Sequence, residues 1–179
     1  MPNTLTLIAS STVGSGGATT IDFTSIPQTY TDLKLVMSTR NQASNGGRDY
    51  ASIRFNGDSG TNYSRVWAYG LDGSPGAGSG TSEPTLRVIV QNDSQSTAST
   101  FSNTEVYIPN YTGSSTKSVS IDSVAENNSN STYVVEMSAS LWNSSSAITY
   151  MTIYPANTSG TGDFFVQHST FYLYGIKKD

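Results

Sequence analysis

The chain contains no cysteine and only one histidine, His168. The absence of cysteine excludes disulfides and thiolate metal sites, so stability must come from packing, backbone hydrogen bonds or association. A single histidine also excludes any site that needs two imidazoles. His168 adjoins Ser169, but neighbouring strand residues point to opposite sides, and the sequence has no Gly-x-Ser-x-Gly elbow. We therefore expect no catalytic role for His168.

Charge is also scarce. Charged residues make up 12% of the 179 residues, with a net charge of -4, against about 25% in a typical soluble domain. The basic residues are scattered along the chain, and only Lys177 and Lys178 are adjacent. Binding to nucleic acid requires clustered lysine and arginine. We therefore expect no nucleic-acid partner.

Long apolar runs are missing as well. No stretch approaches the roughly 20 apolar residues that a membrane-spanning helix requires. Residues 1–9 lack a basic segment, and their apolar run is too short for a signal peptide. These features predict no membrane partner and synthesis in a cytoplasm.

Serine, threonine, asparagine and glycine replace the missing charge, and 11 Tyr, 6 Phe and 2 Trp lie within alternating runs. Such aromatic alternation indicates short strands joined by polar turns, whereas disordered segments are poor in aromatics. No segment keeps a helical apolar stripe, and there is no internal repeat. The expected strands cover residues 4–9, 18–23, 33–38, 51–55, 63–69, 86–90, 101–108, 117–126, 133–142, 147–154 and 170–176.

About ten strands at this spacing predict an all-β fold, an antiparallel two-sheet sandwich. A jelly roll accommodates this number of strands. An immunoglobulin-type sandwich is disfavoured because the cysteine pair is missing and the strands are too many. We expect one domain over residues 1–179, with residues 1–17 as an N-terminal arm or an edge strand.

Two segments carry the expected contact residues. In the last strand, Phe171 and Leu173 share one face and three apolar or aromatic residues share the other, so we expect both faces to be covered, by the chain or by another subunit. In residues 63–69 the aromatic residues share a face with Arg65. That face suits either an interface or core, or a platform on which sugars stack. The candidate subunit-interface residues are Tyr63, Trp67, Tyr69, Tyr172, Tyr174 and Ile176.

Two further expectations concern residues 70–84 and 133–142. The glycine-rich residues 70–84 are predicted to form a long loop and a surface contact. In the strand 133–142, the alternation predicts Val135, Met137, Ala139 and Leu141 to point inward.

The acidic residues are candidates for a catalytic pair, because a glycosidase needs only two carboxylates. Glu105, Asp122, Glu126 and Glu136 all fall on predicted strands, but single charges on solvent-facing positions explain them equally well. Residues 56–60 lack the spacing of a calcium loop and indicate a hairpin turn. We expect no enzymatic activity, no catalytic or metal site and no cofactor.

Four segments resemble a known family. LIAS at 7–10, IDFTSIPQTYTDLKL at 21–35, YIPNY at 107–111 and FYLYGI at 171–176 are similar to small β-sandwich virion structural proteins of tailed bacteriophages, especially cyanophages and phages of other aquatic bacteria. The matched positions are strand cores and a proline turn. The resemblance implies a protein mounted on the particle, either a head decoration (cement) protein, commonly trimeric, or part of a tail fibre.

The expected function is therefore that of a capsid decoration protein, which stabilises the head by binding major capsid subunits. It would be made in the host bacterial cytoplasm and located in the virion. We expect a homotrimer, with residues 70–84 or the N-terminal arm touching the shell. The alternative is a receptor-binding domain of a tail fibre or spike, with Trp67 and Tyr69 exposed to a host glycan. A glycan hydrolase is a third hypothesis, with less support.

Overall fold

The computed structural model describes residues 4–44, 46–128, 133–156 and 163–177, so residues 1–3 of the expected N-terminal arm lie outside it. The described chain is all-β and contains no helix. Its strands are β1 (Leu5–Thr12), β2 (Ile21–Phe23), β3 (Asp32–Thr39), β4 (Arg48–Phe55), β5 (Tyr63–Leu71), β6 (Ser74–Glu83), β7 (Leu86–Asn92), β8 (Ser102–Ile108), β9 (Lys117–Ala125), β10 (Val134–Trp142), β11 (Met151–Ala156) and β12 (Thr170–Ile176).

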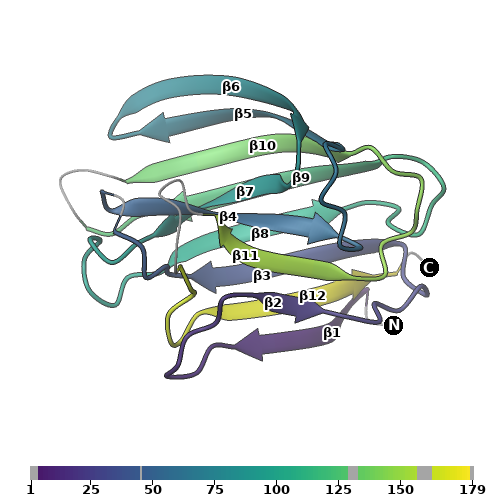
Figure 1. The fold of residues 1–179 in the computed structure, drawn as a ribbon, viewed down its shortest axis with the longest axis horizontal. Coiled ribbons are helices and arrows are strands. Elements are labelled where there is room, and N and C mark those ends of the chain that lie inside the picture. Colours follow the sequence, from purple (N-terminus) through teal and green to yellow (C-terminus); the bar gives the residue numbers. More distant parts are fainter. Residues whose placement is uncertain (1–3, 45, 129–132, 157–162, 178–179) are drawn as a thin grey trace.

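These strands form two antiparallel sheets, confirming the predicted sandwich (Figure 1). The larger sheet has eight strands in the order β1-β12-β3-β8-β9-β10-β5-β6, and the smaller has four in the order β2-β11-β4-β7. Eight of the strands form nested pairs, β1 with β12, β2 with β11, β3 with β8 and β4 with β7. Successive members of this frame alternate between the sheets except for β4 and β7, which are neighbours in the smaller sheet, as in a jelly roll.

The remaining four strands extend the larger sheet beyond this frame. The β5–β6 hairpin is inserted between β4 and β7, and β9 and β10 are inserted between β8 and β11. In Figure 1 the β6 edge lies at the top of the sheet, and β1 forms the opposite edge. The smaller sheet ends with β7, which contacts β9 and β10. The inner face of β5 and β6 therefore projects past the frame.

The core fills the space between the frame sheets. Leu35 on β3 and Phe171 and Leu173 on β12 are fully buried, as their alternation predicts. Facing them from the smaller sheet are Ile53 and Met151, also fully buried. This burial of alternating apolar residues stabilises the sandwich at about 25 cal/mol per Å² of apolar surface.

An aromatic cluster of Phe55, Tyr63 and Trp142 joins β4, β5 and β10. The Tyr63 and Trp142 rings are stacked, with centroids 6.5 Å apart, and Phe55 lies 5.5 Å from Trp142. The Trp142 indole Nε1 donates a hydrogen bond of 2.7 Å to Asp58 Oδ2. Burial raises the pKa of Tyr63 to about 12. Tyr63 thus belongs to the core.

The prediction of a long loop over residues 70–84 was wrong. This segment contains the end of β5, a turn at Asp72 and Gly73, and β6. Asp72 and Gly73 have φ angles of 50° and 80°, and an Asp-Gly pair with positive φ at both positions is the common two-residue hairpin turn. The glycine content concealed a strand.

The glycines of β6 have a packing reason. Gly76 is paired with Tyr69, and Gly78 with Trp67. A Cβ atom at Gly78 would lie 2.4 Å from Trp67 Cζ2, and one at Gly76 would lie 2.3 Å from Tyr69 Cζ. Only glycine leaves room for these rings to lie over the β6 backbone. The aromatic side chains supply the packing that β6 lacks.

The predicted orientation of residues 133–142 was also wrong. Val135, Met137 and Ala139 are exposed, whereas Glu136, Ser138 and Ser140 are buried with Val134 and Trp142. Side chains alternate strictly along a strand, so one deeply buried residue fixes the orientation of all the others. Trp142 has that role here, because its ring is held in the aromatic cluster.

Candidate functional site

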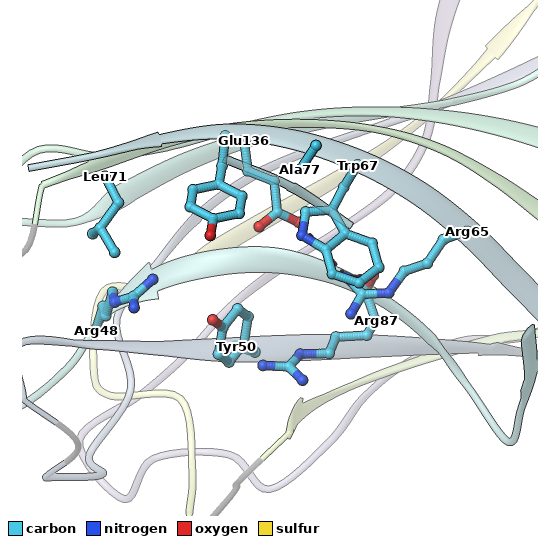
Figure 2. Close-up of a pocket in the computed structure, with 9 residues that line it drawn as sticks. Arg48, Tyr50, Arg65, Trp67, Leu71, Ala77, Arg87 and Glu136 are labelled. Atoms are coloured by element: carbon cyan, nitrogen blue, oxygen red, sulfur yellow. Dashed lines mark hydrogen bonds and ion pairs between the residues drawn. The ribbon is translucent and has the colours of Figure 1, made fainter. Parts of the chain in front are cut away.

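The described structure contains a polar cleft between the two sheets, where β5 and β6 project past the frame. Its volume is about 260 Å³. Strand β10 supplies its acidic residue, and β4, β5 and β7 supply its arginines and aromatic residues (Figure 2). The lining residues are Arg48, Tyr50, Arg65, Trp67, Tyr69, Leu71, Ala77, Arg87 and Glu136.

Arg65 is the most strongly connected residue of the cleft. Its Nε lies 3.4 Å from Glu83 Oε2, and its Nη1 lies 3.7 Å from Glu136 Oε1. Nη1 also donates to the Arg87 carbonyl oxygen at 3.4 Å. Burial lowers the pKa of Arg65, while Glu83 and Glu136 oppose that shift. Arg65 thus remains the counter-ion of two carboxylates in a largely dry setting.

Two arginines of the cleft stack on aromatic rings. The Arg65 guanidinium carbon lies 3.9 Å from the Trp67 ring centroid, and that of Arg87 lies 3.5 Å from the Tyr50 centroid. Trp67 also packs over Gly78 on β6. Stacking restrains a guanidinium, so these arginines are held in place before any ligand binds. The stacked guanidinium groups also cover one face of Trp67 and one face of Tyr50, so these faces are not free to stack against a sugar ring.

Glu136 lies inside the cleft and is only 6% exposed. Burial raises the pKa of its carboxyl group, although the charges of Arg65, Arg87 and Arg48 act in the opposite direction. On the same side of β10 follow Ser138 and Ser140, whose buried hydroxyls have no hydrogen-bond partner among the described residues. The buried side of β10 therefore presents one carboxyl group and two unpaired hydroxyls.

Replacing Glu136 by glutamine is expected to change how stability depends on pH. Because the folded-state pKa is raised, the unfolded chain ionises first as the pH rises, and the wild-type protein loses stability between the two pKa values. A difference of one in pKa between the folded and unfolded chain corresponds to about 1.4 kcal/mol. Chemical denaturation at pH 4 and pH 7 should show E136Q gaining stability relative to wild type at the higher pH.

The matched control is Glu105→Gln, on the opposite face of the larger sheet, where the side chain is half-exposed and pairs with Lys34 at 2.8 Å. E105Q should not gain stability relative to wild type between pH 4 and pH 7. An equal gain in both variants would contradict the assignment to Glu136.

The sequence-based candidate residues do not form one surface. Tyr63 is buried in the core, so its assignment to a subunit interface was wrong. Trp67 and Tyr69 are half-buried and line the cleft. On the outer face of the larger sheet, β12 presents three half-buried residues, Tyr172, Tyr174 and Ile176. Whether these contact another subunit stays a prediction.

The acidic candidates do not form one cluster. Glu105 and Asp122 are cross-strand partners on the exposed face of β8 and β9, whereas Glu136 lies on the buried face of β10. Among the described residues, no group of three histidine, cysteine, aspartate or glutamate side chains is placed to hold a metal ion. In the same part of the chain, no helix is long and apolar enough to cross a membrane.

Sequence reasoning missed the arginine cluster, because its members come from strands far apart in the chain. Arg48, Arg65 and Arg87 belong to β4, β5 and β7. The sequence contained one local signal: Arg65 shares a strand face with the aromatic residues Tyr63, Trp67 and Tyr69. A charged residue among these aromatic residues indicates that the face is not entirely part of the hydrophobic core.

A second surface lies on the other side of the same strands. Val66, Val124, Val135 and Met137 are 55%, 43%, 49% and 62% exposed, and Ala68 and Ala139 lie beside them. Cross-strand pairing joins Val124 to Val135, Met137 to Ala68, and Ala139 to Val66. We call these six residues of β5, β9 and β10 the outer apolar patch.

Comparison with known proteins gives little beyond this geometry. No protein-family model matches the chain, and no curated protein matches it. Among solved structures, a "Crystal structure of Scytalido-glutamic peptidase with a peptide based transition state analog" is similar over 86% of this chain and 72% of that chain, with 16% identity and a TM-score of 0.30. A similarity at that level carries no argument about function. The strand order defines the class, a jelly-roll β-sandwich with an extended sheet.

Proposed function

We propose that this protein is a structural component of a tailed-phage virion, a head decoration protein that associates with its own copies through the outer apolar patch. The observation that carries the proposal is the inverted pattern of β10, with polar residues buried and Val135 and Met137 exposed. Contiguous apolar surface of this kind is typical of interaction sites. The resemblance of the strand and turn segments to phage virion proteins supplies the setting.

A second copy of the chain is the occupant that the charges favour. The chain has 13 acidic and 9 basic residues, so its copies repel one another at neutral pH. The outer apolar patch contains none of these charges. Asp122 borders the patch as the cross-strand partner of Met137. The patch is therefore a surface where copies can bury apolar side chains, with one carboxylate at its edge. The homotrimer implied by the resemblance is the assembly we propose, with the β5–β6 hairpin or the N-terminal strand contacting the shell.

Replacing Met137 by aspartate tests the patch. The new carboxylate would have to be buried against an apolar partner, which costs far more than leaving it in water. Sedimentation velocity of the wild-type protein is expected to show a trimer, whereas M137D should sediment as a monomer at the same concentration. Ser59→Asp adds the same charge at an exposed loop position and should leave the trimer intact.

The particle provides the second readout. Purified wild-type protein should bind phage heads that were assembled without it and raise the temperature at which they release DNA. M137D should bind less and protect less. A monomeric wild-type protein, together with heads that are no less heat-resistant without it, would overturn the proposal.

A second candidate function is recognition of a host-surface glycan by a tail fibre or spike domain. The cleft is the observation that favours it. The version expected from the sequence required exposed Trp67 and Tyr69 rings, but both are half-buried, with Gly78 and Arg65 against the Trp67 ring and Gly76 beneath Tyr69. A ligand would therefore be bound by the polar groups of the cleft.

A further inference from the structure

We infer that the cleft between β5, β7 and β10 binds a saccharide unit that carries a carboxylate, such as a uronic acid residue. This inference deepens the glycan-binding candidate and does not depend on the outer apolar patch. Three features of the cleft carry it: restrained arginines, buried groups that need hydrogen-bond partners, and a small volume.

The arginines require an anionic group in the ligand. Arg48, Arg65 and Arg87 face two carboxylates, Glu83 and Glu136, which leaves a local charge of about +1 in a chain whose net charge is -4. Arg87 Nε is buried and has no hydrogen-bond partner among the described residues. A planar guanidinium donates two parallel hydrogen bonds to a carboxylate. Its stacking on Tyr50 fixes that geometry in advance.

The acidic group of the cleft requires a hydrogen-bond donor in the ligand. Glu136 is 6% exposed and lines the cleft together with the arginines. When ionised it is only an acceptor. The hydroxyl groups of a sugar can donate to it.

These requirements together exclude simpler ligands. Inorganic phosphate offers mainly acceptor oxygens, so it is a poor donor to the Glu136 carboxylate. A neutral sugar would leave the arginines without an anionic partner, and the covered ring of Trp67 limits stacking. A polyhydroxylated carboxylate supplies both kinds of group.

The size of the cleft limits the ligand to a short unit. Its volume of about 260 Å³ is just below the range of roughly 300–1,000 Å³ for pockets that hold drug-sized ligands. One ring of a longer acidic polysaccharide is therefore the unit that we place in the cleft.

The test is a titration of the purified full-length protein by saturation-transfer NMR and calorimetry. The probes are tri-galacturonate, its neutral methyl ester and inorganic phosphate. Tri-galacturonate is expected to bind, the methyl ester to bind at least tenfold more weakly, and phosphate not to compete. Binding of the acid should weaken at least tenfold in Arg87→Met.

A matched control is available on the same strand as Tyr50, outside the cleft. Arg54 also stacks on a tyrosine, with its guanidinium carbon 5.2 Å from the Tyr154 centroid, but it does not line the cleft. Arg54→Met should bind tri-galacturonate like wild type. Circular dichroism and thermal unfolding of both variants show whether a loss of binding results from loss of the folded structure.

Each result decides between specific statements. Equal binding of the ester would overturn the requirement for a carboxylate and leave glycan binding in place. No binding of either saccharide at millimolar concentration would overturn both the inference and the glycan-binding candidate. Displacement by phosphate, or equal losses in Arg87→Met and Arg54→Met, would overturn the assignment to the cleft. None of these results affects the oligomerisation measured by sedimentation.

Discussion

Replacing Trp142 by alanine is expected to lower the free energy of unfolding by about 3–5 kcal/mol, the usual cost of removing a large aromatic side chain from a core. Trp142 is 2% exposed and contacts Phe55 and Tyr63. Its removal opens a cavity between β4, β5 and β10, and it leaves Asp58 without the indole hydrogen bond. Urea denaturation followed by tyrosine fluorescence or circular dichroism measures the change.

Two controls separate the parts of this effect. Trp142→Phe keeps an aromatic ring but removes the donor to Asp58, and its loss should be smaller than that of the alanine variant. Trp67→Ala removes the other tryptophan, which is half-buried in the cleft, and should also cost less. A loss below about 1.5 kcal/mol for Trp142→Ala, within the range of mild core substitutions, would contradict the assignment of Trp142 to the core.

Replacing Arg65 by methionine is expected to cost about 3 kcal/mol at pH 7, because it leaves the buried Glu136 carboxylate without its nearest cation. Methionine keeps much of the apolar stem, so the loss reports on charge more than on packing. The loss should decrease toward pH 4, since Glu136 has a raised pKa and becomes neutral there. Chemical denaturation across this pH range measures it.

The double variant R65M/E136Q is the corresponding control. The double variant removes the buried carboxylate together with its cation, and only Glu83, whose side chain is 27% exposed, loses a counter-ion. It should therefore be more stable at pH 7 than R65M alone. The coupling between the two changes then measures the pair itself. Equal stability of the single and double variants at every pH would show that Glu136 does not depend on Arg65.

Much of the frame was predictable from the sequence, because alternation over short runs reports directly on strands. Residues 33–38 and 170–176 show this, since their inner apolar residues form the core. The β5–β6 hairpin shows where prediction from the alternation pattern fails. Its Asp72-Gly73 turn is a recognisable signal, but the glycines of β6 make sense only once Trp67 and Tyr69 are seen lying over them.

The predicted orientation of β10 was wrong for a related reason. The alternation of Val135 and Met137 with polar residues is real, but alternation alone does not say which face is covered. That choice depends on Trp142 and on the register with β5 and β9, which are long-range properties. The cleft is likewise a long-range property, because β4, β5, β7 and β10 meet only in the folded sheets.

The insertion of the β5–β6 hairpin and of β9 and β10 into connections of the jelly-roll frame has an evolutionary consequence. The nested strand pairs supply most of the core, whereas the inserted strands carry much of both proposed binding surfaces. Lineages that retain the frame can therefore diversify in what they bind by altering the inserted strands. We expect the most rapid sequence divergence among descendants of this gene to lie in residues 63–83 and 117–142, with the framework strands changing slowly.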